Sequence, residues 1–254
     1  MSSCVTGRTS RACWTVAIVA ALLAAGCGGV LKKEYEYEEE IYPSLDGSAT
    51  VYVNASVAAL VALRGADLDV NPRARLDRTR VRALFTGRGV EVASVSTSRR
   101  DGRRFVHVRI NAPDVRALAA VAPLAWSTYR FTRQQDVFAF GQSVGAATAS
   151  QVGDVGWTGK ELVAFRIHVP SRIQFHNSPE DIQRGNILRW EQPLTERLKG
   201  VALDLQVRME TESILLRTLL LFGSTILAAV LAFALIVWWM MRRGRESEMV
   251  GSRP

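Results

Sequence analysis

Two long apolar runs stand near opposite ends of the chain, and a region of alternating residues lies between them. The first run, WTVAIVAALLAAG at 14–26, follows Arg8 and Arg11 and precedes Cys27. A basic start, an apolar core of about a dozen residues and small residues before the cut are typical of a secretory signal peptide. A membrane-spanning helix needs about 20 apolar residues, which is more than this run has. We therefore predict that residues 1–26 are removed on export.

The second run covers residues 218–241 and contains no charged residue. A helix of that length measures about 36 Å at 1.5 Å per residue, enough to cross a bilayer core of about 30 Å. Arg242, Arg243 and Arg245 follow directly, and the positive-inside rule places such a cluster in the cytoplasm. The sequence thus predicts an exported domain at 27–217, a transmembrane helix and a basic cytoplasmic tail at 242–254.

The exported region reads mainly as short strands. Alternation predicts strands over 32–42, 49–57, 127–133, 137–144, 161–170, 172–177, 186–192 and 201–210, and a hairpin over 90–110 around Asp101-Gly102. Helices are expected at 57–65, at 76–87 with Asp77 as its cap, and from Asp114 to about Ala122, while 145–156 reads as a long, mobile loop. This pattern predicts an α+β fold, mainly an antiparallel sheet with short helices inserted between hairpins, plus the C-terminal transmembrane helix.

The first predicted strand carries a run of glutamates. In KKEYEYEEEIY, alternation places Tyr35, Tyr37 and Ile41 on one side and the glutamates at 34, 36, 38 and 40 on the other. We interpret the five glutamates, residues 34, 36, 38, 39 and 40, as a solvated strand face, with weak binding of a divalent ion as the alternative. They do not suggest a catalytic pair, because paired acid and base work needs carboxylates in different environments.

The cysteines favour acylation over a disulfide. Cys4 and Cys13 lie in the segment predicted to be removed, so Cys27 alone remains in the mature chain. LLAAGC, which ends the first apolar run, resembles the lipobox of bacterial lipoproteins, although Ala24 stands where that motif usually has leucine. The resemblance implies that Cys27 becomes the N-terminus and carries fatty acyl groups such as palmitate. An ordinary signal peptide and an uncleaved signal anchor are the alternatives.

The last third of the exported region resembles the LppM-like family of bacterial envelope lipoproteins. The similarity lies in FRIHVPSRIQFHN followed by GNILRW, within residues 165–190, and in the order of lipobox, exported domain and one C-terminal span. The matching positions are Pro170, Asn177, Gly185, Asn186 and Trp190. This resemblance implies an envelope lipoprotein that binds lipids, and it implies no catalytic residues.

Composition and motifs give little support for catalysis. With 254 residues, 48% hydrophobic and 22% charged, the chain is neither disordered, collagen-like nor a disulfide scaffold. Its three histidines, His107, His168 and His176, stand at no metal-ligand spacing, and no GxSxG or GxxxxGK[ST] motif occurs. We therefore predict no enzyme, no catalytic residue, no metal site and no cofactor.

Positive charge is concentrated in one part of the exported region. Between Arg64 and Arg133 the sequence has 15 arginines and 6 acidic residues. Around the Asp101-Gly102 turn the concentration is highest, with Arg99, Arg100, Arg103 and Arg104. These arginines either decorate a solvated face or contact an anionic partner: lipid headgroups, an acidic envelope polymer or another protein. An exported, membrane-fixed chain does not meet nucleic acid, so the pI of 9.9 does not indicate DNA binding.

Two functions follow from these patterns. In the first, the chain is an envelope lipoprotein of the bacterial cytoplasmic membrane, and its extracytoplasmic domain is a non-catalytic binding module for lipid or an anionic envelope component. In the second, it is an interaction or scaffold protein of an envelope complex with no small-molecule ligand. A large void under the sheet would favour the first, and a packed core the second. Two short linkers to the membrane also predict a domain held flat against it.

Overall fold

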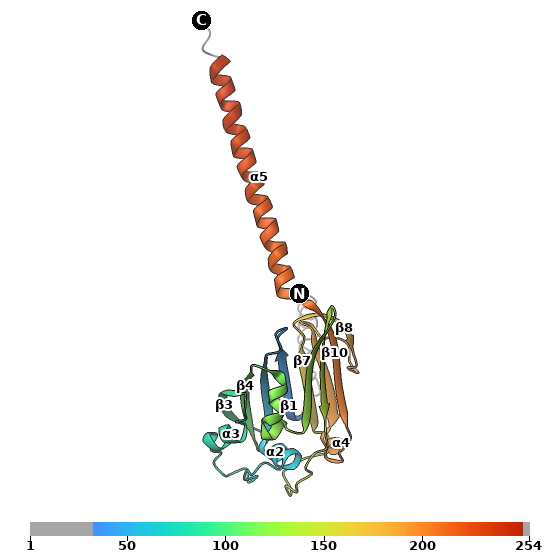
Figure 1. Cartoon of the computed structure of the whole chain (residues 1–254). Helices are drawn as coiled ribbons and strands as arrows, with labels where there is room; N and C mark the ends of the chain where they lie inside the picture. Colours follow the sequence, from blue (N-terminus) through green and yellow to red (C-terminus); the bar gives the residue numbers. More distant parts are fainter. Residues whose placement is uncertain (1–32, 251–254) are drawn as a thin grey trace, which may run out of the picture. The chain divides into compact units, whose positions relative to one another are not determined.

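The structure is a computed structural model that describes residues 33–250, as two β-sheets with short helices and one long helix (Figure 1). The elements are β1 (Tyr35–Pro43), β2 (Ala49–Ser56), α2 (Val57–Arg64), α3 (Arg78–Leu84), β3 (Glu91–Arg100), β4 (Arg103–Ala112), η1 (Val115–Ala120), η2 (Ala122–Leu124), β5 (Ser127–Gln134), β6 (Val137–Val144), β7 (Leu162–His168), β8 (Ser171–His176), β9 (Ile187–Pro193), α4 (Leu194–Leu198), β10 (Leu203–Ser213) and α5 (Ile214–Val250). The predicted α+β class is confirmed, with the strands divided between two sheets.

Sheet A has the strand order β3-β4-β2-β1-β7-β9, and sheet B has the order β5-β6-β10-β8. Neighbouring strands are antiparallel except β1 and β7, which run parallel. The predicted hairpin at 90–110 is confirmed as β3 and β4. Its turn residues Asp101 and Gly102 have φ of 50° and 74°, the left-handed pair that matches the twist of a two-residue hairpin.

The space between the sheets is filled by aromatic and aliphatic side chains. The ring of Tyr37 in β1 lies 5.3 Å from that of Trp126 and 6.1 Å from that of Phe165 in β7. Phe140 of β6 and Val207 of β10 are buried on the facing sheet. This packing, rather than a void under the sheet, is what the structure has at its centre.

The short helices follow local capping signals. Ser56 caps α2 through a hydrogen bond from the N–H of Ala59, and Gly65 ends it in the left-handed region with φ of 61°. Asp77 caps α3 as predicted, but this helix ends at Leu84 rather than at 87. The helix expected from Asp114 is two 3₁₀ turns, η1 and η2. The five-residue helix α4 was not predicted.

The interpretation of the β1 glutamates as a solvated face is wrong for two of the five. Glu36 and Glu39 are fully buried. The pairing of β1 with β7 shifts register between Tyr35 and Tyr37, so alternation along the strand is interrupted at Glu36. Glu39, in contrast, shares the inward face with Tyr37 and Ile41 through regular alternation along the strand. β1 is flanked by strands on both sides.

The β3–β4 turn and the start of α5 lie at opposite ends of sheet A. Because β1 and β7 are parallel, Tyr35 lies where β7 begins. Next to the turn, Arg100 donates from Nη2 to the carbonyl oxygen of Tyr35 at 2.5 Å. At the other end, beyond the last residue of β7, the N–H of Ile214 donates to the carbonyl oxygen of Pro170 at 3.3 Å. The domain therefore continues into α5 at the end farthest from the arginine-rich turn.

The long helix α5 contains an apolar stretch, Thr218–Met240, that is long and apolar enough to cross a membrane. None of its most apolar window is buried against the rest of the chain, which is consistent with association with a membrane. The predicted signal peptide at 1–26 and Cys27 lie outside the described residues.

Candidate functional site

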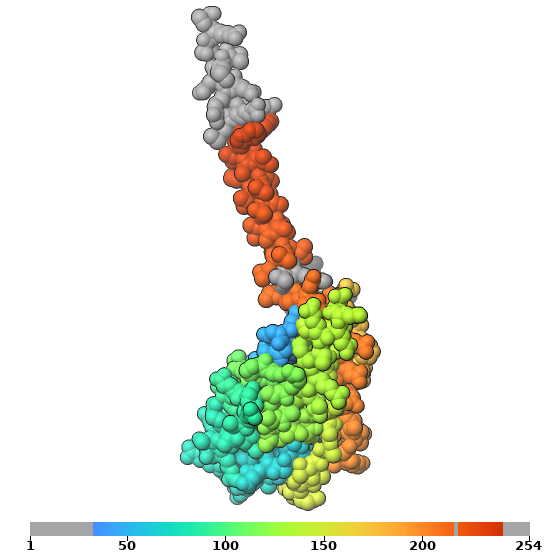
Figure 2. All heavy atoms as spheres, in the orientation of Figure 1, coloured from blue at the N-terminus to red at the C-terminus, as the bar shows by residue number. Residues whose placement is uncertain are grey.

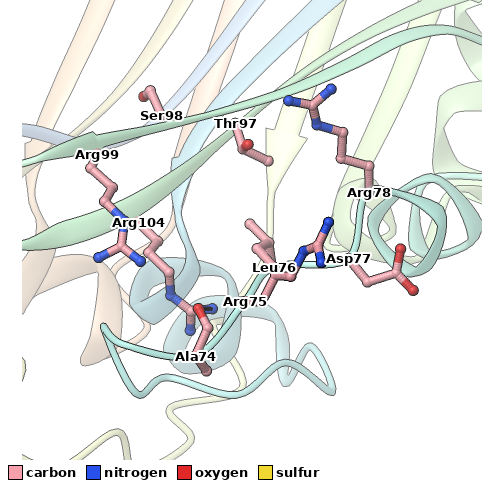
Figure 3. A pocket seen from close by; sticks show the side chains of 9 residues that line it. All are labelled: Ala74, Arg75, Leu76, Asp77, Arg78, Thr97, Ser98, Arg99 and Arg104. Atoms are coloured by element: carbon pink, nitrogen blue, oxygen red, sulfur yellow. Dashed lines mark hydrogen bonds between the residues drawn. The ribbon is translucent and has the colours of Figure 1, made fainter.

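The largest hollow described here lies between the β3–β4 hairpin and the segment that leads into α3 (Figure 3). Its volume is about 950 Å³. The residues that line it are Ala74, Arg75, Leu76, Asp77, Arg78, Thr97, Ser98, Arg99 and Arg104. We call this hollow the basic pocket.

Four of the lining residues are arginines, and one is acidic. Figure 3 shows Arg99 and Arg104 entering from the hairpin, and Arg75 and Arg78 from the segment before and at the start of α3. The carboxylate of Asp77 accepts a hydrogen bond from the N–H of Thr79 at 2.8 Å, so it is engaged in capping α3. The pocket therefore carries an excess of positive charge and a set of donors suited to anions.

Arg104 forms the buried part of this pocket. Its side chain donates from Nη1 to the carbonyl oxygen of Ala74 at 3.0 Å and from Nη2 to that of Asp69. The residue is only 5% exposed, and its Nε has no hydrogen-bond partner. Burial lowers the pKa of the Arg104 guanidinium from its usual value, but an arginine keeps its charge at physiological pH. This charged side chain thus lies beside the hollow and holds the segment before α3 through its backbone hydrogen bonds.

The four arginines predicted to contact an anionic surface are divided between the two faces of sheet A. Arg99 is exposed and, with Arg104, lines the basic pocket. Arg103 is buried on the other face, with Nε 3.1 Å from Oε1 of Glu36 and Nη1 donating to the carbonyl oxygen of Gly156 at 2.9 Å. Arg100 stacks on the ring of Phe105, with its Cζ 4.2 Å from the ring centroid. These four side chains therefore do not form one solvated cluster.

Two arginines of the basic pocket were missed in the sequence, because Arg75 and Arg78 precede Arg99 by more than 20 residues. The excess of arginine between Arg64 and Arg133 includes them. It does not tell which of the 15 arginines converge, since that depends on how the segment before α3 folds back over the hairpin.

The predicted mobile loop at 145–156 has no helix or strand, as expected. Hydrogen bonds, however, attach it to α2. The N–H groups of Thr148 and Ser150 donate to carbonyl oxygens at the end of α2, at 2.9 and 3.1 Å. Further along, Trp157 donates from Nε1 to Oε2 of buried Glu36 at 3.1 Å. In Figure 2 this yellow-green segment lies beside the cyan residues that include α2.

The positions that carry the family resemblance join β7, β8 and β9. Nε1 of buried Trp190 donates to Oδ1 of Asn177 at 3.2 Å, and Nδ2 of Asn186 donates to the carbonyl oxygen of Ser171 at 2.9 Å. Gly185 and Asn186 have φ of 88° and 57°. These residues set strand connections, and they lie apart from the basic pocket.

The histidines occupy polar surroundings. Oε1 of Glu40 lies 2.5 Å from Nε2 of His168, and this contact lowers the pKa of the Glu40 carboxyl. His107 lies between Ser98 and Asn54. Within residues 33–250 no group of three or more His, Cys, Asp or Glu side chains is placed to hold a metal ion.

No family model and no curated protein matches the chain. Among solved structures, the folded domain of LppM from Mycobacterium tuberculosis, determined by NMR, is 13% identical, with a TM-score of 0.38. The match covers 72% of this chain and 94% of that domain.

Proposed function

We propose that this chain is a membrane-anchored binding protein whose domain holds an anionic group in the basic pocket without changing it chemically. The observation that carries this proposal is the convergence of Arg75, Arg78, Arg99 and Arg104 on one hollow whose only acidic lining residue is Asp77. Guanidinium groups bind phosphate and carboxylate oxygens through paired, charge-assisted hydrogen bonds.

The size and lining of the pocket favour an anionic headgroup or a segment of an acidic polymer. About 950 Å³ is near the upper end of the range for ligand pockets, which is about 300–1,000 Å³, and exceeds the volume of one phosphate ion. Leu76 and Ala74 are the apolar residues in the lining. This composition suits a polar ligand better than an acyl chain.

The place that we propose for the protein is the bacterial cytoplasmic membrane, with the domain outside and the C-terminus in the cytoplasm. The apolar helix Thr218–Met240 supports the anchor. The arginines at 242, 243 and 245 support the orientation, and LLAAGC supports acylation of Cys27. The scaffold alternative stays open because acidic side chains of another envelope protein present the same chemistry, and the filled core between the sheets favours that alternative.

The proposal is tested with the full chain in nanodiscs of phosphatidylcholine. Calorimetry measures binding of dihexanoyl phosphatidylglycerol, dihexanoyl phosphatidylcholine and inorganic phosphate, which separates a lipid headgroup from a free anion. The pocket variant is Arg75→Ser/Arg78→Ser/Arg99→Ser. Arg104 is left unchanged because it holds the segment before α3. The matched control removes three exposed arginines elsewhere, Arg88→Ser/Arg130→Ser/Arg184→Ser.

We expect at least one anionic probe to bind and the neutral lipid not to bind. The pocket variant should bind the anionic probe at least about tenfold more weakly, which corresponds to a loss of about 1.4 kcal/mol in binding free energy. Losing a single hydrogen bond to a charged group would cost about that much or more. The control variant should stay within about twofold. An equal loss of affinity in both variants would show that the anion responds to the overall positive charge of the domain and not to the basic pocket. No binding of either anionic probe would overturn the proposal and leave the scaffold alternative.

A further inference from the structure

Three polar side chains form a hydrogen-bonded chain across three adjacent strands of sheet A. Oγ of Ser98 in β3 lies 2.7 Å from Nε2 of His107 in β4. Nδ1 of the same histidine lies 2.8 Å from Oδ1 of Asn54 in β2. Ser98 is exposed, while His107 and Asn54 are half-buried. Neighbours in a strand point to opposite faces, so the side chain of Ser98 leaves the sheet on the face opposite to that of Arg99.

The partners fix the direction of the two hydrogen bonds. An amide oxygen only accepts, so Nδ1 of His107 carries the proton and donates to Asn54. Nε2 then holds a lone pair, and the hydroxyl of Ser98 donates to it. This is the order of nucleophile, base and orienting group found in Ser-His-Asp triads and, with asparagine in third place, in Cys-His-Asn triads.

The surroundings keep the base neutral and the nucleophile accessible. Burial, helped by the charge of Arg100, lowers the pKa of His107 from its usual value, and Glu38 opposes the shift. An imidazole with a pKa below its ordinary value near 6.5 is unprotonated at pH 7. Arg100 also lies two residues from Ser98, on the same face of β3, where its charge favours an approaching group that is negative.

We propose that Ser98 is a base-activated nucleophile that accepts an acyl group from an activated acyl donor with an anionic leaving group, such as an acyl phosphate. Oγ of Ser98 bonds to the carbonyl carbon while its proton moves to Nε2 of His107. The bond between that carbon and the leaving oxygen then breaks, and the leaving group takes the proton from Nε2. The product is one acylated serine. Ser98 is also among the residues that line the basic pocket, but the inference does not depend on an anion bound there and requires no turnover.

The test uses the full chain in detergent micelles and a biotinylated fluorophosphonate. Oγ of an activated serine displaces fluoride from this reagent and forms a bond to phosphorus, while His107 takes the proton. Peptide mass spectrometry then locates the adduct. The variants are Ser98→Ala and His107→Gln, and the matched control is Ser96→Ala, because Ser96 is also exposed and lies two residues away on the same strand.

We expect the adduct on Ser98 in the unaltered chain and in Ser96→Ala, and none at that position in Ser98→Ala. His107→Gln should label at least about 100-fold more slowly, the usual contribution of a general base. The heat-denatured chain gives the intrinsic reactivity of an isolated serine. If Ser98 in the folded chain labels no faster than in the denatured chain, the proposal is overturned, whether or not His107→Gln folds. Unchanged labelling in a folded His107→Gln chain would also overturn it.

Discussion

Glu39 is a carboxylate at the centre of the domain, and it connects the two sheets. Oε1 accepts hydrogen bonds from the hydroxyl of Tyr129 in β5 at 2.7 Å and from Nε2 of Gln142 in β6 at 2.8 Å. Oε2 accepts from the hydroxyl of Tyr37 at 3.0 Å. Burial raises the pKa of the Glu39 carboxyl, and these three donors partly offset the rise.

This shift predicts how stability depends on pH. A carboxyl with a raised folded-state pKa contributes stability that is fully present below its unfolded pKa and is lost as pH rises through the folded value. Glu39→Gln removes the titrating group and keeps an acceptor oxygen. We therefore expect the unfolding temperature of the full chain in micelles to fall less between pH 4.5 and pH 7 in the variant than in the unaltered chain.

Glu40→Gln is the matched control for this prediction, because it removes a neighbouring carboxyl whose pKa is lowered. A carboxyl with a lowered folded-state pKa stabilises the folded chain at higher pH, and this stability is lost as pH falls through the folded-state value. The Glu40 variant should therefore lose stability relative to the unaltered chain as pH rises from 4.5. Identical pH profiles for Glu39→Gln and the unaltered chain would contradict the role of Glu39.

At the scale of elements, features set by neighbouring residues were predicted well from the sequence. Contacts between segments far apart in the sequence were not. The cap at Asp77, the stop at Gly65 and the turn at Asp101 depend on neighbouring residues, so the sequence pattern reveals them. The parallel pairing of β1 and β7 joins segments from opposite halves of the exported region. No local periodicity indicates which strand lies beside β1, and the burial of Glu36 at the register shift follows from that placement. The inward position of Glu39 was readable from its alternation with Tyr37 and Ile41.

The same limit applies to the basic pocket. The hairpin was predictable, and with it the proximity of Arg99 and Arg104 across paired positions. The contribution of Arg75 and Arg78 depends on hydrogen bonds from Arg104 to the backbone at 69 and 74. An irregular segment gives no pattern from which such contacts can be inferred.

Gly87 shows how an element boundary and a packing constraint can be confused. Its place after an apolar helical pattern suggested a helix stop, but α3 ends at Leu84. A Cβ at Gly87 would lie 2.8 Å from the backbone oxygen of Ala120 and 3.0 Å from its carbonyl carbon. The glycine is needed because the 3₁₀ segment η1 ends against it.

We expect Gly87→Ala to destabilise the domain by about 1–3 kcal/mol, the usual cost of forcing extra atoms into a packed site. In a domain of this size each kcal/mol lowers the unfolding temperature by about 2–4 °C. Gly141→Ala is the control, because its nearest contact would be 3.9 Å, with the backbone oxygen of Leu205. Thermal unfolding of the two full-chain variants checks this, and an equal drop in both would contradict it.

At the scale of the whole molecule, the two proposed anchors attach to opposite ends of the domain. The chain enters β1 at Tyr35, where β7 begins, and α5 begins beyond the end of β7. The seven residues of β7 separate these ends by about 23 Å at 3.3 Å per residue. A domain fixed to one bilayer at both ends has its length along the membrane, which is the arrangement that two short linkers predict.

With the proposed topology, we expect the arginine-rich turn to be held near the bilayer by a lipid on Cys27 rather than by α5. From Cys27 to Tyr35 the chain has eight residues, at most about 29 Å when extended. We expect Cys27→Ala, exported behind a signal peptide that is cleaved without lipidation so that residues 1–26 do not remain as an anchor, to release this end of the domain. The helix Thr218–Met240 should keep the protein membrane-bound. A fluorophore at Asp101→Cys reports on the released end, and one at Gln135→Cys, in the turn between β5 and β6 next to the end of β10, reports on the end that continues into α5.

Quenching by lipids spin-labelled at the headgroup measures how near each fluorophore lies to the bilayer. In the chain that keeps Cys27, both positions should be quenched. In the Cys27→Ala chain, quenching at position 135 should persist and quenching at position 101 should fall at least about twofold, because an unanchored end about 23 Å from α5 lies beyond contact with the headgroups for much of the time. Equal quenching at position 101 with and without Cys27 would show that the lipid does not position this end. If the Cys27→Ala chain were released from the membrane, the proposal that α5 is a membrane anchor would be contradicted.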